Sequence, residues 1–176
     1  MNSCSCLGTP TVSTPPACTP NTDCLIMSDI IVACQDAVGP CGAIGTLNFV
    51  THPSPPTSYN HNTTGCGLNS LNFKLLDWDK ELFTSVTLSG STISWTTTQD
   101  TTKVNKFGVV KMKAVCVMLS SLFCITICLK NLCQNNTCTT SQECNKCTGV
   151  CQAKSIDVSI GDSSANIDIN VVWYIM

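Results

Sequence analysis

Hydrophobic and polar residues alternate along much of the chain, and this pattern predicts β-strands rather than helices. Residues 71–75 carry apolar side chains at every second position, as a half-buried strand does. The alternation returns at 86–88 and 93–95, on either side of a Ser-Gly-Ser turn sequence at 89–91. These segments predict a strand followed by a β-hairpin.

The most apolar part of the chain, residues 107–129, also has the period of strands. Apolar residues alternate with lysines and small residues through 110–116, and a second alternating set at 123–129 follows a turn expected at Ser120-Ser121. The apolar run 114–129 has 16 residues, fewer than the ~20 that a membrane-spanning helix needs. We therefore expect two antiparallel strands here and no membrane span.

The remaining segments divide the chain. Residues 1–28 are rich in Thr, Pro and Cys without any period, which predicts an extended N-terminal arm. Residues 29–67 contain two strand-like segments, 29–34 and 44–50, that predict a β-hairpin followed by a Pro/Asn-rich linker. Alternating apolar residues in 154–176 predict a C-terminal β-hairpin, which must join another sheet because a lone hairpin is marginal in water.

The composition fits an ordered β protein and argues against nucleic-acid binding. Only 11% of the residues are charged, compared with a usual ~25%, and Thr, Ser and Asn fill most polar positions. All nine basic residues are Lys and the formal net charge is −2, so the chain lacks the Arg side chains that recognise phosphate and guanine in bidentate fashion. A weakly charged surface also provides little repulsion between copies.

Cysteine is the most informative residue type, with 15 in the chain and a dense cluster at 131–153. This cysteine-rich excursion has too few apolar residues to form a core, so cross-links are the favoured explanation. A disulfide that closes a short loop contributes about 2–3 kcal/mol. The loop between the first two strands has a cysteine at each end, Cys34 and Cys41, and a disulfide between them could close it. The disulfide candidates are Cys34, Cys41, Cys128, Cys133, Cys138, Cys144, Cys147 and Cys151.

Two other states of these cysteines stay open. A zinc site would use Cys133, Cys138, Cys144 and Cys147, although the first two are closer together and less regularly spaced than a zinc knuckle. Reduced or interchain thiols are the second alternative, because the cysteine count is odd and the N-terminus shows neither the basic nor the apolar region of a secretory signal. A redox enzyme is disfavoured because no βαβ pattern surrounds the Cys-x-x-Cys at 144–147.

No set of residues predicts catalysis, and no cofactor is expected. His52 and His61 both lie in the Pro/Asn-rich linker, which lacks a scaffold to orient a base. Asp77, Asp79 and Glu81 have the alternate spacing of a calcium loop but lack its further oxygen ligands and glycine, so a solvated turn is expected. The glycosylation triplets at Asn62 and Asn135 are common by chance in an Asn/Thr-rich chain.

Residues 68–130 resemble a known class of β module. Trp95 on a strand, a Thr-rich connection, then GVVKMKAVC at 108–116 and LFCITICLK at 122–130 are similar to the last strands of bacterial Ig-like and PKD-like modules. The resemblance implies an Ig-like antiparallel β-sandwich at 68–130, although the expected Tyr of the penultimate strand is absent. These modules occur on bacterial surface proteins and on phage particles.

A small chain with such a module behind a Thr/Pro/Cys arm also resembles the small virion proteins of tailed crAss-like bacteriophages. This resemblance implies a non-enzymatic capsid decoration, head-fibre or tail component. Such a protein would assemble with other virion subunits or with itself in the host cytoplasm, and its cysteines would oxidise after release. It would reside in the virion.

Two functions other than that of a virion component are also compatible with the sequence. The first is an extracellular or cell-surface adhesion or carbohydrate-binding module that stacks host glycans on Tyr59, Trp78 or Trp173. The second is a zinc-binding interaction module at 128–151.

Overall fold

The structure is a computed structural model that describes residues 24–52, 57–59 and 67–155. The predicted arm before residue 24 and all but the first two residues of the predicted hairpin at 154–176 lie outside the described residues. The strands are β1 (Leu25–Met27), β2 (Ile30–Val32), β3 (Ile44–Asn48), β4 (Thr57–Tyr59), β5 (Asn72–Trp78), β6 (Phe83–Ser89), β7 (Thr92–Thr97), β8 (Phe107–Cys116), β9 (Leu119–Cys128), β10 (Gln142–Cys144) and β11 (Cys151–Ala153), and the short 3-10 helices are η1 (Leu68–Ser70) and η2 (Thr101–Lys103).

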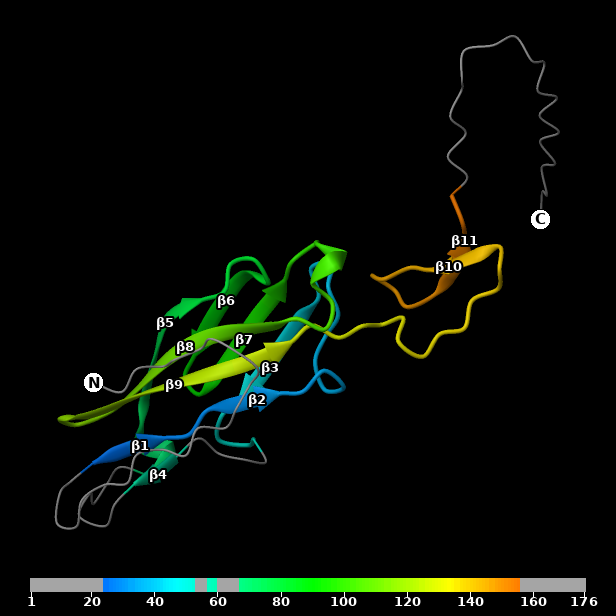
Figure 1. Ribbon diagram of the computed structural model, residues 1–176. Helices are drawn as coiled ribbons and strands as arrows, with labels where there is room; N and C mark the ends of the chain where they lie inside the picture. Colours follow the sequence, from blue (N-terminus) through cyan, green and yellow to red (C-terminus); the bar gives the residue numbers. More distant parts are fainter. Residues whose placement is uncertain (1–23, 53–56, 60–66, 156–176) are drawn as a thin grey trace, which may run out of the picture.

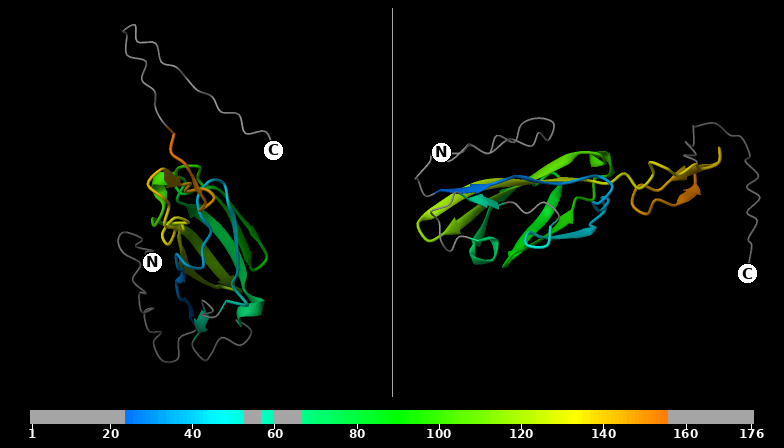
Figure 2. Two further views of the ribbon diagram at one scale, coloured as in Figure 1. Left: turned by 90° about the vertical axis from the view of Figure 1, so that its right-hand side faces the viewer. Right: turned by 90° about the horizontal axis from the view of Figure 1, so that it is seen from below.

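Two sheets pack face to face as a β-sandwich (Figure 1). One has the strand order β2-β9-β8-β5 and the other the order β3-β7-β6. The short pairs β1-β4 and β10-β11 lie outside these two sheets. Figure 2 shows the β10-β11 pair projecting beyond one end of the sandwich. The prediction of an all-β fold with a cysteine-rich region is confirmed.

The core follows the alternation in the sequence. On β8, Val110, Met112 and Ala114 are fully buried, whereas the lysines between them point outward. They meet Ile93 and Trp95 of β7, which face inward from the opposite sheet. The β8–β9 pairing is continuous over ten residue pairs, and this hairpin forms the centre of the four-stranded sheet.

Three aromatic side chains pack against one another in one part of the core. Phe49 lies 4.9 Å from Phe73 and 6.0 Å from Phe123, measured between ring centroids, and the rings are tilted or edge-on. Such geometries are the favourable ones for aromatic rings. Phe49 follows β3, Phe73 belongs to β5 and Phe123 to β9, so the cluster links distant parts of the sequence.

The predicted β-hairpin at 29–67 is wrong. β2 pairs in parallel with β9, and β3 pairs antiparallel with β7 in the opposite sheet. The connection 33–43 is long enough to cross between the sheets, and Ile30 and Val32 bury their side chains only by joining the four-stranded sheet. The sandwich therefore has mixed pairing, and it includes residues 25–50 in addition to the predicted 68–130 domain.

Two predicted boundaries also shift. The β8–β9 turn consists of Val117 and Met118, because Cys116 pairs with Leu119; the predicted turn residues Ser120-Ser121 lie within β9. The buried Ser121 hydroxyl instead accepts a hydrogen bond from the Met27 N–H. The last residues of the predicted arm form β1, whose Leu25 and Met27 are buried in the core.

The apolar run 114–129, whose length was compared above with that of a membrane-spanning helix, lies almost entirely within the β8–β9 hairpin. Among the described residues, no helix is long and apolar enough to cross a membrane.

Candidate functional site

All eight cysteines predicted as disulfide candidates are paired in the structure. The four bridges are Cys34–Cys128, Cys41–Cys147, Cys133–Cys144 and Cys138–Cys151. The predicted closure of the first loop by Cys34 and Cys41 is wrong. The crossing between sheets carries this loop past the end of β9, so each of its cysteines bonds to a distant part of the chain.

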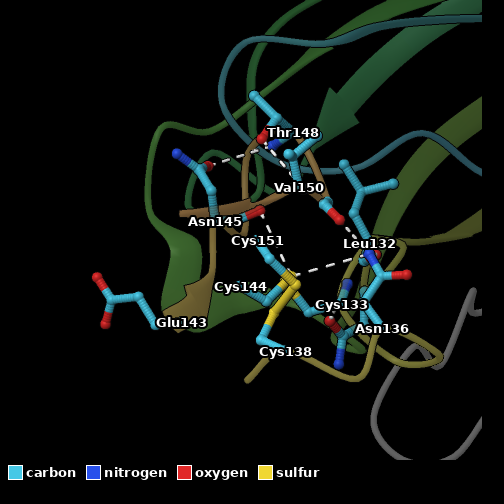
Figure 3. Close-up of a disulfide and its surroundings, with 12 residues drawn as sticks. Leu132, Cys133, Asn136, Cys138, Glu143, Cys144, Asn145, Thr148, Val150 and Cys151 are labelled. Carbon is cyan, nitrogen blue, oxygen red and sulfur yellow. Dashed lines mark hydrogen bonds between the residues drawn. A yellow bond between two sulfur atoms is a disulfide. The ribbon is translucent and has the colours of Figure 1, made fainter. Parts of the chain in front are cut away.

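Residues 131–155, which we call the cysteine-rich unit, are held by these bridges rather than by a core. None of its residues is fully buried. Cys41–Cys147 ties the unit to the β2–β3 connection, and two more disulfides lie inside it. Its turns are fixed by side-chain amides: Asn145 Oδ1 accepts from the N–H groups of Cys147 and Thr148, and Asn136 Nδ2 donates to the Gly149 carbonyl. Figure 3 shows the bond between Asn145 and Thr148.

The zinc alternative does not fit this arrangement. Its four candidate ligands Cys133, Cys138, Cys144 and Cys147 belong to three different disulfides, and a disulfide sulfur is not the thiolate that zinc binds. In the part of the chain that the structure describes, no group of three or more His, Cys, Asp or Glu side chains is placed to hold a metal ion.

The acidic residues at 77–81 form a turn held by ion pairs. Asp77 accepts from Lys80 at 2.7 Å, and Glu81 accepts from Lys103 at 2.8 Å. The hydrogen bond from Lys103 lowers the pKa of the Glu81 carboxyl. Asp79 Oδ1 accepts from the Glu81 N–H. These carboxylate oxygens accept hydrogen bonds from other groups of the protein, as in an ordinary solvated turn.

A groove separates the two sheets along one side of the sandwich. It has a volume of about 490 Å³ and lies between the edge strands β2 and β3. We call it the β2–β3 groove. Asp36 and His52 contribute polar atoms to its lining. His61, the other predicted candidate, lies outside the described residues. Most of the lining is apolar and includes Ile31, Val32, Val38, Gly45, Leu47 and Trp95.

Trp95 and Gly45 form part of this groove through a close cross-strand contact. They are directly paired between β7 and β3, and the indole lies over the glycine. A Cβ atom at Gly45 would lie 2.3 Å from Cε2 and Cζ2 of Trp95, so no larger residue fits. Trp95 is 3% exposed, and its Nε1 has no hydrogen-bond partner among the described residues. The groove lining therefore includes a buried donor for which the described part of the chain provides no acceptor.

The backbone edge of β3 is open. Ala43 O accepts from Thr97 N and Phe49 N donates to Ser91 O, so the odd-numbered residues make the ladder with β7. The N–H and C=O groups of Ile44 and Thr46 consequently point away from β7. No described strand pairs with this edge, and the Ile44 side chain beside it is 70% exposed.

Other apolar and aromatic residues bear on surface contacts. Val117 and Met118 at the tip of the β8–β9 hairpin are 88% and 93% exposed. Trp78, predicted as a glycan platform, is partly buried, donates its indole N–H to the Phe83 carbonyl and has Lys80 Nζ 5.0 Å from its ring centroid. The Tyr59 side chain and Trp173 lie outside the described residues. The Trp78 ring is thus already engaged within the protein.

Comparison with known proteins identifies no family. No family model matches the chain, and no curated protein matches it. Among solved structures, the endo-fucoidan hydrolase MfFcnA4 of glycoside hydrolase family 107 and a variant of that enzyme each align with a TM-score of 0.40 and 12% identity. The alignments cover 72% of this chain for the enzyme and 74% for the variant, and 17% of each enzyme chain, so this chain spans about a sixth of their length.

The β2–β3 groove was not predicted from the sequence. Its one sequence signal is Gly45 within an apolar strand, because a glycine there often marks the close approach of another group. The partner of that glycine and the parallel addition of β2 both depend on contacts between residues far apart in the chain.

Proposed function

We propose that this chain is a non-enzymatic structural subunit of a viral particle, as a capsid decoration, head-fibre or tail component of a bacteriophage. It acts through contacts between subunits. The observation that supports this function best is the open β3 edge beside an apolar groove. An unpaired strand edge readily accepts a strand from another chain, and soluble proteins usually protect such edges.

The disulfides and the weakly charged surface also support a structural role. Cys41–Cys147 joins the cysteine-rich unit to the sandwich, and the other three bridges lie within the sandwich or within the unit. Such cross-linking suits a protein that must persist outside a cell. With 11% charged residues, copies of the chain repel each other little and can pack closely.

The test is whether the chain belongs to particles. Particles from the virus or cell that encodes the chain are separated on a density gradient, and each fraction is analysed by quantitative peptide mass spectrometry. The proposal predicts that the chain migrates with the particles, in many copies, and stays bound after a high-salt wash. Recovery only in fractions of small soluble proteins would contradict it.

A truncation locates the contact. A variant without residues 1–23 lacks the arm but keeps β1, whose Leu25 and Met27 belong to the core, whereas a variant with Asn135→Gln changes one exposed side chain of the cysteine-rich unit. The truncation is expected to lower particle attachment, and the single substitution to leave it unchanged. Circular dichroism of both variants shows whether the sandwich still forms.

A further inference from the structure

We infer that the β2–β3 groove is a docking site for the C-terminal segment 167–175 of a second copy of this chain, which adds as a strand to the open edge of β3. This inference rests on the proposed function and names the contact through which it would act.

The edge of β3 differs from the other sheet edges. β5 has a register shift between Leu75 and Asp77, and β6 has one between Phe83 and Ser85. Such bulges disturb the regular spacing that a new strand needs. β3 pairs with β7 over five consecutive residues without a shift, and Ile44–Asn48 contains no proline and no charge. β2, the remaining edge strand of the two sheets, has only three residues. β3 is therefore the edge of the two sheets best suited to accept another strand.

The groove requires apolar side chains from its occupant. A strand added to β3 points every second side chain into the space between the sheets, where Leu47 and Val32 line the groove. It also brings backbone carbonyls and polar atoms to a region in which Trp95 Nε1 has no described acceptor. The side chains on its outer face would cover the exposed Ile44.

Segment 167–175 has the sequence for this position. Apolar residues occupy its five odd-numbered positions, so they all fall on one face of a strand, and Asp168 and Asn170 fall on the other. The N-terminal residues 1–23 fit less well, because their four prolines cannot contribute a continuous strand. The linker residues 60–66 are almost entirely polar.

The position of the cysteine-rich unit favours a second copy over the same chain. The segment that follows β11 starts from this unit, which projects beyond the end of the sandwich in Figures 1 and 2. Cys41–Cys147 fixes the unit to its own sandwich. A segment that starts at this projecting end is well placed to reach the β3 edge of a neighbouring molecule.

A photo-crosslinking experiment tests the inference on the full-length oxidised protein. A benzophenone amino acid replaces Ile44, and in a matched control it replaces Leu76, which is 51% exposed on a different edge strand. Equal amounts of unlabelled and ¹⁵N-labelled protein are co-assembled and irradiated. The expected product at position 44, and not at 76, joins it to peptides from 167–176, with mixed isotopic composition.

The outcomes separate this inference from the proposed function. If assemblies form but position 44 does not cross-link to 167–176, or does so only within one isotopic form, the docking inference is wrong and the structural function stands. If the protein remains monomeric and gives no intermolecular product, the docking inference is wrong, whereas the proposed function fails only if the chain is also absent from particles in the gradient experiment.

A pair of charge substitutions gives a second readout. Ile44→Asp places a carboxylate where the added strand would cover it, and its dehydration should raise the concentration needed for assembly by about tenfold or more. Leu76→Asp is the matched control and should leave that concentration unchanged. Because both side chains are exposed, both variants are expected to fold, which circular dichroism verifies. Equal effects of the two substitutions would overturn the inference.

Discussion

Replacing Cys34 and Cys128 together with alanine removes the disulfide that joins the β2–β3 connection to the end of β9. The two cysteines are 94 residues apart, and a lone bridge around a loop of this size stabilises a protein by about 4.7 kcal/mol through the entropy of the unfolded chain. The other disulfides change this expectation, because they already hold the same regions together.

The loop that this bridge closes is short once the other bridges are in place. From Cys34 the path runs seven residues to Cys41, crosses to Cys147, follows three residues to Cys144, crosses to Cys133, and returns through five residues to Cys128. A circuit of about 15 residues corresponds to about 3 kcal/mol. The cavity left at the fully buried position 128 adds on the order of 1 kcal/mol.

Guanidinium unfolding of the oxidised proteins, followed by tryptophan fluorescence, measures the effect. The double variant is expected to lose about 3–4 kcal/mol. The control replaces Cys138 and Cys151, whose bridge lies within the cysteine-rich unit, and should change the unfolding free energy of the sandwich by less than about 1 kcal/mol. A loss below about 1 kcal/mol in the first variant would refute the Cys34–Cys128 pairing. A loss well above about 5 kcal/mol would mean that the alternative path through Cys41–Cys147 does not exist.

Three further predictions concern stability. Gly45→Ala should destabilise the sandwich by about 1–3 kcal/mol, because the new methyl group meets the Trp95 ring, whereas Gly67→Ala meets nothing within 4 Å and should be near neutral in the same unfolding assay. Lys103→Met should raise the pKa of Glu81 toward its ordinary value of 4.5 in an NMR titration; since that pKa is lowered in the folded protein, the pair stabilises above about pH 4.5 and the gain is lost as pH falls through the lowered pKa. An unchanged Glu81 titration would contradict the ion pair. Mild thiol reduction should expose the cysteine-rich unit to proteolysis before the sandwich, and earlier cleavage of the sandwich would show that the unit has stability of its own.

The strands that could be predicted are those whose neighbours are close in sequence. The alternation at 110–116 identified the buried face of β8, and the Ser-Gly-Ser sequence placed the β6–β7 turn correctly. Strand β2 was assigned to the wrong partner, because its three residues contain no information about the parallel neighbour that buries them. Pattern reasoning identifies a strand and its inward face, but strand order depends on contacts that form only in the folded chain.

The disulfides show the same limit of prediction from sequence: bonded residues can be identified, but their partners cannot. Sequence reasoning selected eight cysteines that are all bonded, because a segment without a core needs cross-links. It could not select their partners, because eight cysteines allow 105 pairings. The β2–β3 groove was missed for a related reason, because it lies between strands of opposite sheets. The need for a glycine at position 45 becomes evident only when the Trp95 ring is seen to pack against it.

Native mass spectrometry of the oxidised full-length chain over a concentration series tests most directly whether the protein works through contacts between copies. We expect assemblies with masses at whole multiples of the 18.8 kDa chain, which dissociate to monomers when residues 167–176 are removed. A chain that stays monomeric at all concentrations, or assemblies that are unaffected by this truncation, would contradict this expectation.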